Sequence, residues 1–246
     1  MKTVLTIFFL EIIYKYYLYQ NLFTNTSQYH IEMESVNYDP LSFNQSGQHV
    51  QECFLQGSVF DKSVDQLHER LQGLCENVTP EALMEHEKTY HMKQANSSLP
   101  IVVKVVKAHL RGSFPIQMKY CGTVEGANTK SKPANSRTVV TVACNKDPDE
   151  FLKQLGFTMM FEAQIKGHFY RKGHIKIVVA KLVNITKTFD QSKLEKVNTS
   201  HIVEASLSSA LRDDRAAEEL SRFAQGLKPI VNLEKMDLRN IMGAFK

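Results

Sequence analysis

The sequence contains no tryptophan and only four cysteines among its 246 residues. The cysteines stand singly, with no C-x-x-C pair and no Cys/His cluster at zinc-site spacing; they are Cys53, Cys75, Cys121 and Cys144. Single thiols are the ordinary state in a reducing compartment, so we expect neither disulfides nor a structural metal. A dense basic run is also lacking, and the net charge is only +4. Nothing in the charge pattern therefore demands direct contact with nucleic acid.

Long hydrophobic runs are lacking as well. The apolar run at residues 4–10 is far shorter than the ~20 residues that a membrane span needs, and no A-x-A cleavage pattern follows it. Residues 24–50 are rich in Asn, Ser and Gln, a composition typical of disorder. We therefore expect a disordered or atypical leader at residues 1–48, a single domain at residues 49–246, and no membrane contact.

The most informative stretch is residues 156–183, GFTMMFEAQIKGHFYRKGHIKIVVAKLV. Its β-branched and aromatic residues, bounded by glycines, predict strands at residues 157–165 and 175–183. Residues 168–174 between them should form a polar hairpin tip. There His168 and His174 lack a nearby nucleophile or acid to orient them, so a catalytic triad is not indicated.

Alternation gives the second of these strands two faces. One should be core; it carries Ile175, Ile177, Val179 and Lys181. The other face contains Val178, Ala180 and Leu182, which is too apolar for open water. We therefore expect a helix of this chain, or another protein, to cover that second face.

Further strands are predicted at residues 53–60, 84–92, 101–106, 138–143 and 202–207. Helices are predicted at residues 63–74 and 147–156 and from residue 213 or 214, and a polar loop at residues 122–136. Strands follow one another without intervening helices. This order predicts an α+β fold with a largely antiparallel sheet or barrel.

Glu85 and Glu87 are the most suggestive pair for catalysis. On a strand they point to the same side, where two carboxylates favour Mg²⁺ or Mn²⁺. The pattern is similar to the E-x-E-x-K signature of triphosphate tunnel enzymes, but Lys88 falls one position early, on the opposite face. Octahedral metal sites need more oxygen ligands, and only Glu162 and Glu204 remain on the other strands. A solvated strand face without metal or cofactor is therefore favoured.

Three long segments carry a more specific signal. They are residues 54–87, beginning FLQGSVFDKSVDQLHERL, residues 155–182, beginning LGFTMMFEAQIKGHFYRKG, and residues 223–237, FAQGLKPIVNLEKMD. Together and in this order they resemble the family of subunit 18 of the Mediator complex, a part of its head module.

The resemblance implies a many-stranded β-barrel of the triphosphate-tunnel type, flanked by helices, whose catalytic carboxylates are gone. It implies pairing with Mediator subunit 20, attachment through the C-terminal helix of subunit 8, contacts with other head-module subunits, and an indirect link to RNA polymerase II. The chain would then be a non-catalytic structural subunit in the nucleus that uses no cofactor. The alternative, a tunnel-type metal-dependent phosphohydrolase or polyphosphate binder, depends on Glu85 and Glu87.

Contiguous exposed apolar residues mark partner surfaces. The apolar face of the strand at residues 175–183, or the neighbouring strand at residues 101–106, is therefore expected at or beneath the contact with subunit 20. The predicted interface residues are Val178, Ala180, Leu182, Ile101, Val103 and Val105.

Overall fold

The computed structural model describes residues 49–76, 78–93, 100–110, 114–125, 132–144, 146–187, 199–209 and 214–235. The strands are β1 (His49–Phe60), β2 (Glu81–Met92), β3 (Ile101–Ala108), β4 (Ile116–Cys121), β5 (Asn135–Cys144), β6 (Thr158–Lys172), β7 (Ile175–Lys187) and β8 (Ser200–Ser209). The helical elements are the 3-10 turn η1 (Asp61–Ser63) and the helices α2 (Val64–Leu74), α3 (Asp149–Gln154) and α4 (Asp214–Gln225). The predicted leader at residues 1–48 lies outside the described residues.

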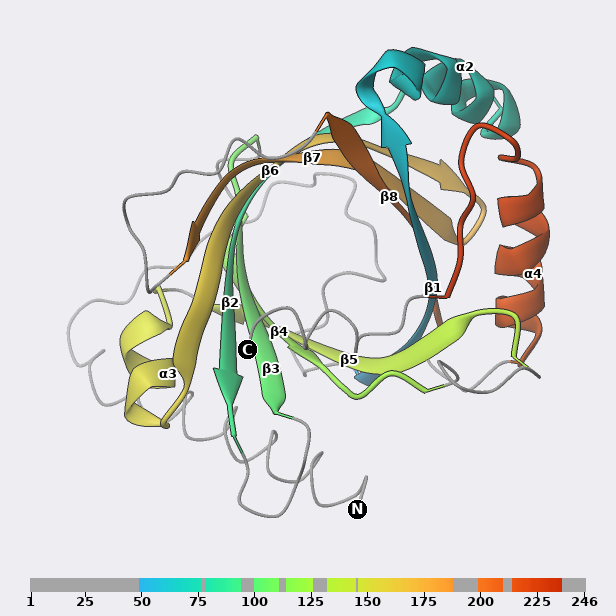
Figure 1. The fold of residues 1–246 in the computed structure, drawn as a ribbon. Helices are drawn as coiled ribbons and strands as arrows, with labels where there is room; N and C mark the ends of the chain where they lie inside the picture. The colour runs from blue at the N-terminus through green and yellow to red at the C-terminus, as the bar shows by residue number, and fades with distance from the viewer. Residues whose placement is uncertain are drawn as a thin grey trace, which may run out of the picture.

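The strands close into a barrel in the order β1-β5-β4-β3-β2-β6-β7-β8 (Figure 1). Every pair of neighbouring strands is antiparallel. The predicted class, an α+β fold with a largely antiparallel barrel and flanking helices, is therefore confirmed. Among the described residues, no helix has the length and apolar character that crossing a membrane requires.

A long hairpin of β6 and β7 forms one wall of the barrel. Its pairing extends as far as Lys172 opposite Ile175, and Gly173 makes the turn at a φ of +55°, which glycine adopts without steric cost. The predicted polar tip at residues 168–174 is therefore wrong in extent. Phe169 and Tyr170 belong to β6 and are buried, because pairing with β7 continues through them.

β4 was not predicted, although its sequence IQMKYC alternates between the two faces of the sheet. Met118 and Tyr120 are buried on one side, while Gln117 and Lys119 take the other. The strand is short, and polar residues at alternate positions interrupt its apolar residues. A prediction based on continuous apolar runs therefore does not detect it. Several predicted strands are also longer than expected; β1 begins at His49 instead of residue 53.

α2 and α4 lie outside the barrel and cover β1, β7 and β8 (Figure 1). The apolar cluster between them includes Leu67 of α2, Leu220 of α4, and Ile177 and Val203 of the sheet, none of which has exposed surface. The predicted apolar stripe of the last helix is buried in this cluster; it consists of Leu220, Phe223, Ala224 and Leu227. The stripe therefore packs on the chain's own sheet.

A second apolar cluster brings residues of β2, β3, β4 and β5 together with Phe151 and Leu152 of α3. An ionic contact fixes the start of this helix: Lys88 Nζ on β2 lies 3.1 Å from Asp147 Oδ2 and also pairs with Asp149. Burial alone would lower the pKa of Lys88, but the two carboxylates outweigh it and raise that pKa. Lys88 therefore holds α3 against the outer wall.

The apolar core thus lies between the barrel wall and its helices, and the other side of each strand faces the lumen. On β7, Val178 stands opposite Phe169 and Glu204, and Ala180 stands opposite Gly167. These residues lie on the side away from the buried Ile177. The face that we expected a helix or another protein to cover therefore looks across the barrel's own lumen.

We predict that Gly167→Ala lowers the free energy of unfolding by about 1–3 kcal/mol, a typical cost of overpacking. A Cβ atom at this position would lie 2.1 Å from the carbonyl oxygen of Val179 and 2.6 Å from Cα of Ala180, so the β7 backbone must shift. Gly73→Ala on α2 is the control, because nothing lies within 4 Å of a Cβ there; it should gain up to about 1 kcal/mol. Chemical denaturation followed by circular dichroism measures both changes. Unchanged stability of Gly167→Ala would contradict the close approach of β6 to β7.

Candidate functional site in the barrel lumen and the barrel wall

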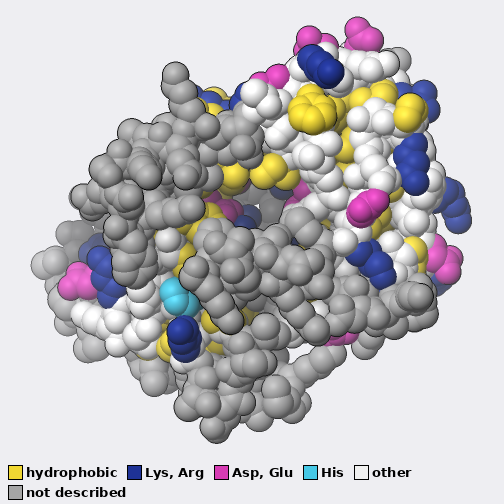
Figure 2. All heavy atoms as spheres, viewed as in Figure 1, with side chains coloured by type: hydrophobic (Ala, Val, Ile, Leu, Met, Phe, Trp, Pro, Cys, Tyr) yellow, Lys and Arg dark blue, Asp and Glu magenta, His cyan; other side chains and the backbone are white. Residues whose placement is uncertain are grey.

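Charged and polar side chains line the lumen. Residues directly opposite one another on neighbouring strands share a face, and the register carries this face around the barrel from the pair Glu52–Arg137. The set includes Glu52, Gln56, Glu85, Glu87, Lys104, Lys119, Arg137, Lys176 and Glu204. Acidic and basic side chains are both visible within the central opening in Figure 2. The lumen therefore carries charges of both signs.

Two ion pairs hold lumen carboxylates. Arg137 Nε lies 2.6 Å from Glu52 Oε2, and Lys104 Nζ lies 2.8 Å from Glu87 Oε1. Burial would raise the pKa of Glu87, but the charge and hydrogen bond of Lys104 outweigh it and lower that pKa. Burial would likewise lower the pKa of Lys104, and the Glu87 carboxylate raises it instead. Both partners are therefore charged at neutral pH.

The remaining lumen charges are also close to one another. Glu204 accepts a hydrogen bond from the side-chain amide of Gln56. Burial and the charge of Lys119 lower the pKa of Lys176, although the Lys176 side chain keeps access to solvent. Its ammonium nitrogen lies 5.3 Å from the centre of the Phe169 ring. In the described part of the chain, no three His, Cys, Asp or Glu side chains gather as possible metal ligands.

The carboxylate pair singled out in the sequence lies as its spacing predicted. Glu85 and Glu87 share the lumen face, and Lys88 points to the opposite side. Of the other predicted acids, Glu204 faces the lumen, whereas Glu162 pairs with a histidine of β2 on the outer face. Sequence reasoning missed Glu52, because the first strand was predicted to begin one residue after it. The alternation of side chains between the two faces of this strand extends back to His49 and could have revealed Glu52.

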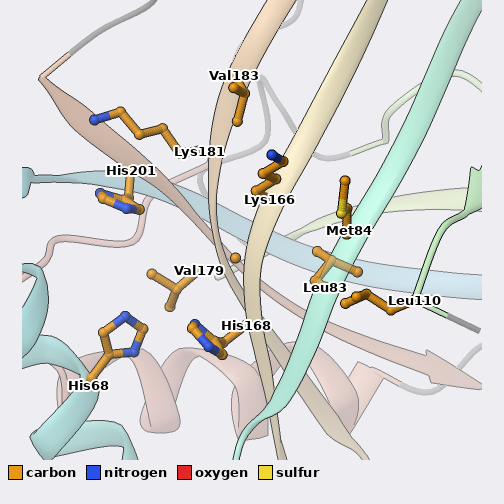
Figure 3. A pocket seen from close by; sticks show the side chains of 11 residues that line it. His68, Leu83, Met84, Leu110, Lys166, His168, Val179, Lys181, Val183 and His201 are labelled. Carbon is orange, nitrogen blue, oxygen red and sulfur yellow. The ribbon is translucent and has the colours of Figure 1, made fainter.

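A groove of about 470 Å³ lies in the outer wall of the barrel, beside α2 (Figure 3). Its apolar lining consists of Leu83, Met84, Leu110, Val179 and Val183. Its basic and imidazole lining consists of Lys166, Lys181, His68, His168 and His201. These residues come from β2, β6, β7, β8, α2 and the segment after β3. We call this feature the wall groove.

One carboxylate balances part of the charge at the wall groove. Asp61 of η1 lies 2.5 Å from Lys181 Nζ and 3.1 Å from His201 Nδ1. The hydrogen bond from Lys181 is the main cause that lowers the pKa of Asp61. Burial, followed by the nearby His168, lowers the pKa of His68, whose Nδ1 lies 2.6 Å from the Tyr170 hydroxyl oxygen. His68 is therefore a mostly neutral imidazole at neutral pH.

The two histidines that we predicted at the hairpin tip are separated. His168 lies within β6 and faces the wall groove, where its ring meets that of His68 edge to face at 5.4 Å between centroids. His174 is exposed in the turn. The meeting of His68 with His168 joins residues 100 positions apart, so no local sequence signal could have revealed it.

The six predicted interface residues are divided between two faces. Val178, Ala180 and Leu182 lie on the lumen side, where Val178 and Leu182 are half-buried and Ala180 is buried. The three from β3 lie on the outer side in the cluster with α3; they are Ile101, Val103 and Val105, exposed by 5%, 0% and 4%.

Comparison with known proteins identifies relatives along most of the chain. A family model described as "Med18 protein" matches residues 51–242. A Danio rerio protein named "Mediator of RNA polymerase II transcription subunit 18" is 36% identical over 193 residues, covering 78% of this chain and 92% of its own length. A Drosophila melanogaster protein of the same name is 37% identical over 195 residues, covering 78% and 88%.

Solved structures share the fold at low sequence identity. A chain in the structure of the Schizosaccharomyces pombe Mediator head module has a TM-score of 0.57 and 14% identity, with 76% of this chain and 98% of that chain covered. The PH1819 protein from Pyrococcus horikoshii OT3 has a TM-score of 0.54 and 14% identity, with 79% and 99% covered. At this level of identity the likeness shows the barrel fold alone.

We predict that Glu87→Gln lowers stability at pH 7 by about 1–3 kcal/mol, because Lys104 then loses its carboxylate. The loss of stability should be near the lower end of this range, because 33% of the Lys104 side chain remains exposed to solvent. The folded-state pKa of Glu87 is lowered, so its contribution is present above the unfolded value of about 4.3 and is lost as the pH falls further. Urea denaturation at pH 7 and below pH 4 should show the variant and the wild type converging in acid.

The exposed Glu69 on α2 supplies the control. Glu69→Gln should match the wild type at both pH values within about 0.5 kcal/mol. A Glu87→Gln variant as stable as the wild type at pH 7 would show that the lumen pair does not stabilise the barrel.

Proposed function

Because this chain belongs to the Med18 protein family, we propose that it is a non-catalytic structural subunit of the Mediator complex and works in the nucleus to regulate transcription by RNA polymerase II. The observation that carries this proposal is the extent of the match. It spans residues 51–242 and thus includes α2, α3, α4 and the barrel except for the first two residues of β1. The relatives are matched over about nine-tenths of their length.

The state of the lumen carboxylates supports a non-catalytic role. Glu52 and Glu87 are engaged by Arg137 and Lys104, and Glu204 accepts from Gln56. A metal-dependent phosphohydrolase needs carboxylate oxygens that are available to a cation. In this barrel, binding a cation at Glu87 would first require breaking its contact with Lys104.

We further propose that Mediator subunit 20 and the C-terminal helix of subunit 8 are direct partners, and that RNA polymerase II is reached through the other head-module subunits. An apolar end of the lumen face supports a protein contact. Ile202 stands opposite Ala180 and is 44% exposed, and Phe60, at the end of β1, is 64% exposed. Exposed large apolar side chains that share one region mark protein contacts.

The predicted interface residues have different roles in this proposed contact, because they differ in exposure. Val178 and Leu182 are half-buried and border the apolar end, so we propose that they touch subunit 20 directly. Val103 has no exposed surface, and it therefore lies beneath any contact on its side of the barrel. An obligate interface of this kind buries ~2,000 Å² or more, so the chain alone should be prone to aggregate.

We predict that the tagged wild-type chain recovers Mediator subunits 8 and 20 from nuclear extract, as measured by mass spectrometry. The double variant Val178→Lys, Leu182→Lys should lose most of subunit 20, because two buried charges would oppose an apolar contact. Val78→Lys is the control; Val78 is 57% exposed in the segment after α2, and its variant should recover both partners.

Retention of subunit 8 shows whether the double variant is folded. Loss of subunit 20 with subunit 8 retained supports the proposed contact. Full recovery of subunit 20 removes Val178 and Leu182 from the interface, and recovery of no Mediator subunit by the wild-type chain overturns the proposed function itself.

For catalysis, we predict that the purified chain releases no phosphate from a nucleoside triphosphate in the presence of Mn²⁺. The expected reason is that Lys104 occupies the Glu87 carboxylate. A malachite-green assay should give the same background for the wild type and for the double variant Glu85→Gln, Glu87→Gln. Release by the wild type that the double variant abolishes would establish the alternative, a metal-dependent phosphohydrolase.

A further inference from the structure

We propose that the wall groove is a docking site for an acidic amphipathic segment of another protein. Such a segment carries apolar residues on one side and carboxylates beside them. The wall groove lies on the outer face of β6 and β7, whereas Val178 and Leu182 lie on the lumen face. The proposed site is therefore separate from the proposed contact with subunit 20.

The floor of the wall groove offers apolar surface that remains accessible. Leu110 is 53% exposed and Val183 is 37% exposed, and the half-buried Leu83 and Met84 add to this apolar lining (Figure 3). Large apolar side chains clustered in a concave surface favour a ligand with apolar groups of its own. A small inorganic anion would leave this floor uncovered, so the floor selects for a peptide.

The rim of the wall groove has a charge arrangement that is unfavourable in the isolated chain. Lys166 on β6 stands directly opposite Lys181 on β7, and like charges in directly opposite positions destabilise a sheet. Asp61 pairs with Lys181. Among the described residues, no carboxylate lies within ion-pair distance of Lys166. A carboxylate from a partner would relieve this repulsion. The docking segment should therefore be negatively charged.

Three histidines line the wall groove beside the two lysines. The ring of His168 lies 5.4 Å from that of His68 between centroids, and His201 Nδ1 lies 3.1 Å from Asp61. In Figure 3 the three imidazoles and Lys181 lie to one side of Lys166, and Leu83, Met84 and Leu110 lie to its other side. The counter-charges already present are Asp61, against Lys181 and His201, and Asp65, which acts on His68. Charge complementarity therefore favours an acidic partner over a neutral or basic one.

The test uses a designed probe. A fluorescein-labelled peptide of about 18 residues carries leucine and phenylalanine along one helical face and glutamate beside them. A second peptide has lysine in place of each glutamate, and a third has serine in place of each apolar residue. Fluorescence anisotropy with the full chain should show saturable binding of the first peptide and at least about tenfold weaker binding of the other two.

Lys166→Glu tests the rim and should weaken binding of the acidic peptide by at least about tenfold, because a carboxylate would replace the attracting charge. Its unfolding midpoint should stay unchanged or rise, since the repulsion across the strands is removed, and this separates loss of binding from misfolding. Leu110→Ser tests the floor and should also weaken binding. Lys153→Glu makes the same charge change on the exposed face of α3 and should alter affinity by less than about twofold.

Three outcomes of these binding measurements would contradict the proposed docking site. Failure of the acidic peptide to bind, equal binding of its lysine counterpart, or unchanged binding by Lys166→Glu would each overturn the proposal. Val178→Lys with Leu182→Lys should leave peptide binding unchanged. The proposal for the wall groove can therefore be overturned while the proposed contact with subunit 20 is supported. The opposite result can be recognised in the same way.

Discussion

Closure of the antiparallel sheet gives every strand two very different environments. Alternate side chains point outward, where Ile177 and Val203 are covered by α2 and α4, or inward, where solvent and charge can be accommodated. Because residues directly opposite one another on paired strands share a face, a charge on one strand meets a charge on its neighbour, as Glu52 meets Arg137. The position of the helices and the pairing of the lumen charges both depend on this closure.

The paired lumen connects the structure with the proposed role of the protein. A charged interior can remain in a folded barrel only if its charges are solvated or paired. Here Lys104 and Glu87 satisfy each other, and each shifts the pKa of the other toward the charged form. The same contact that stabilises the wall therefore keeps a carboxylate occupied. This is consistent with a subunit that acts through its surfaces.

The two proposed binding surfaces lie on opposite sides of one wall. Along β7, Val178 faces the lumen and the next residue, Val179, faces the wall groove. One strand thus contributes to both sides of the wall, and the β6–β7 sheet separates the two surfaces. A subunit of a large assembly benefits from such an arrangement, because neighbours on opposite sides of a wall do not compete for the same residues.

The sequence by itself determined the strand-rich hairpin, the apolar stripe of α4, the opposite orientations of Glu87 and Lys88, and the family, because these depend on local periodicity or on long matched segments. Only the tertiary structure decided which face of β7 is the lumen, since alternation separates two faces without saying what covers each. It also decided that Glu52 meets Arg137, that Lys166 faces Lys181, and that His68 joins His168. Glu52–Arg137 and His68–His168 join distant segments, and they exist because the strands close into a barrel and α2 packs against its wall. Lys166 meets Lys181 through the register of the β6–β7 hairpin, which the alternation alone does not fix.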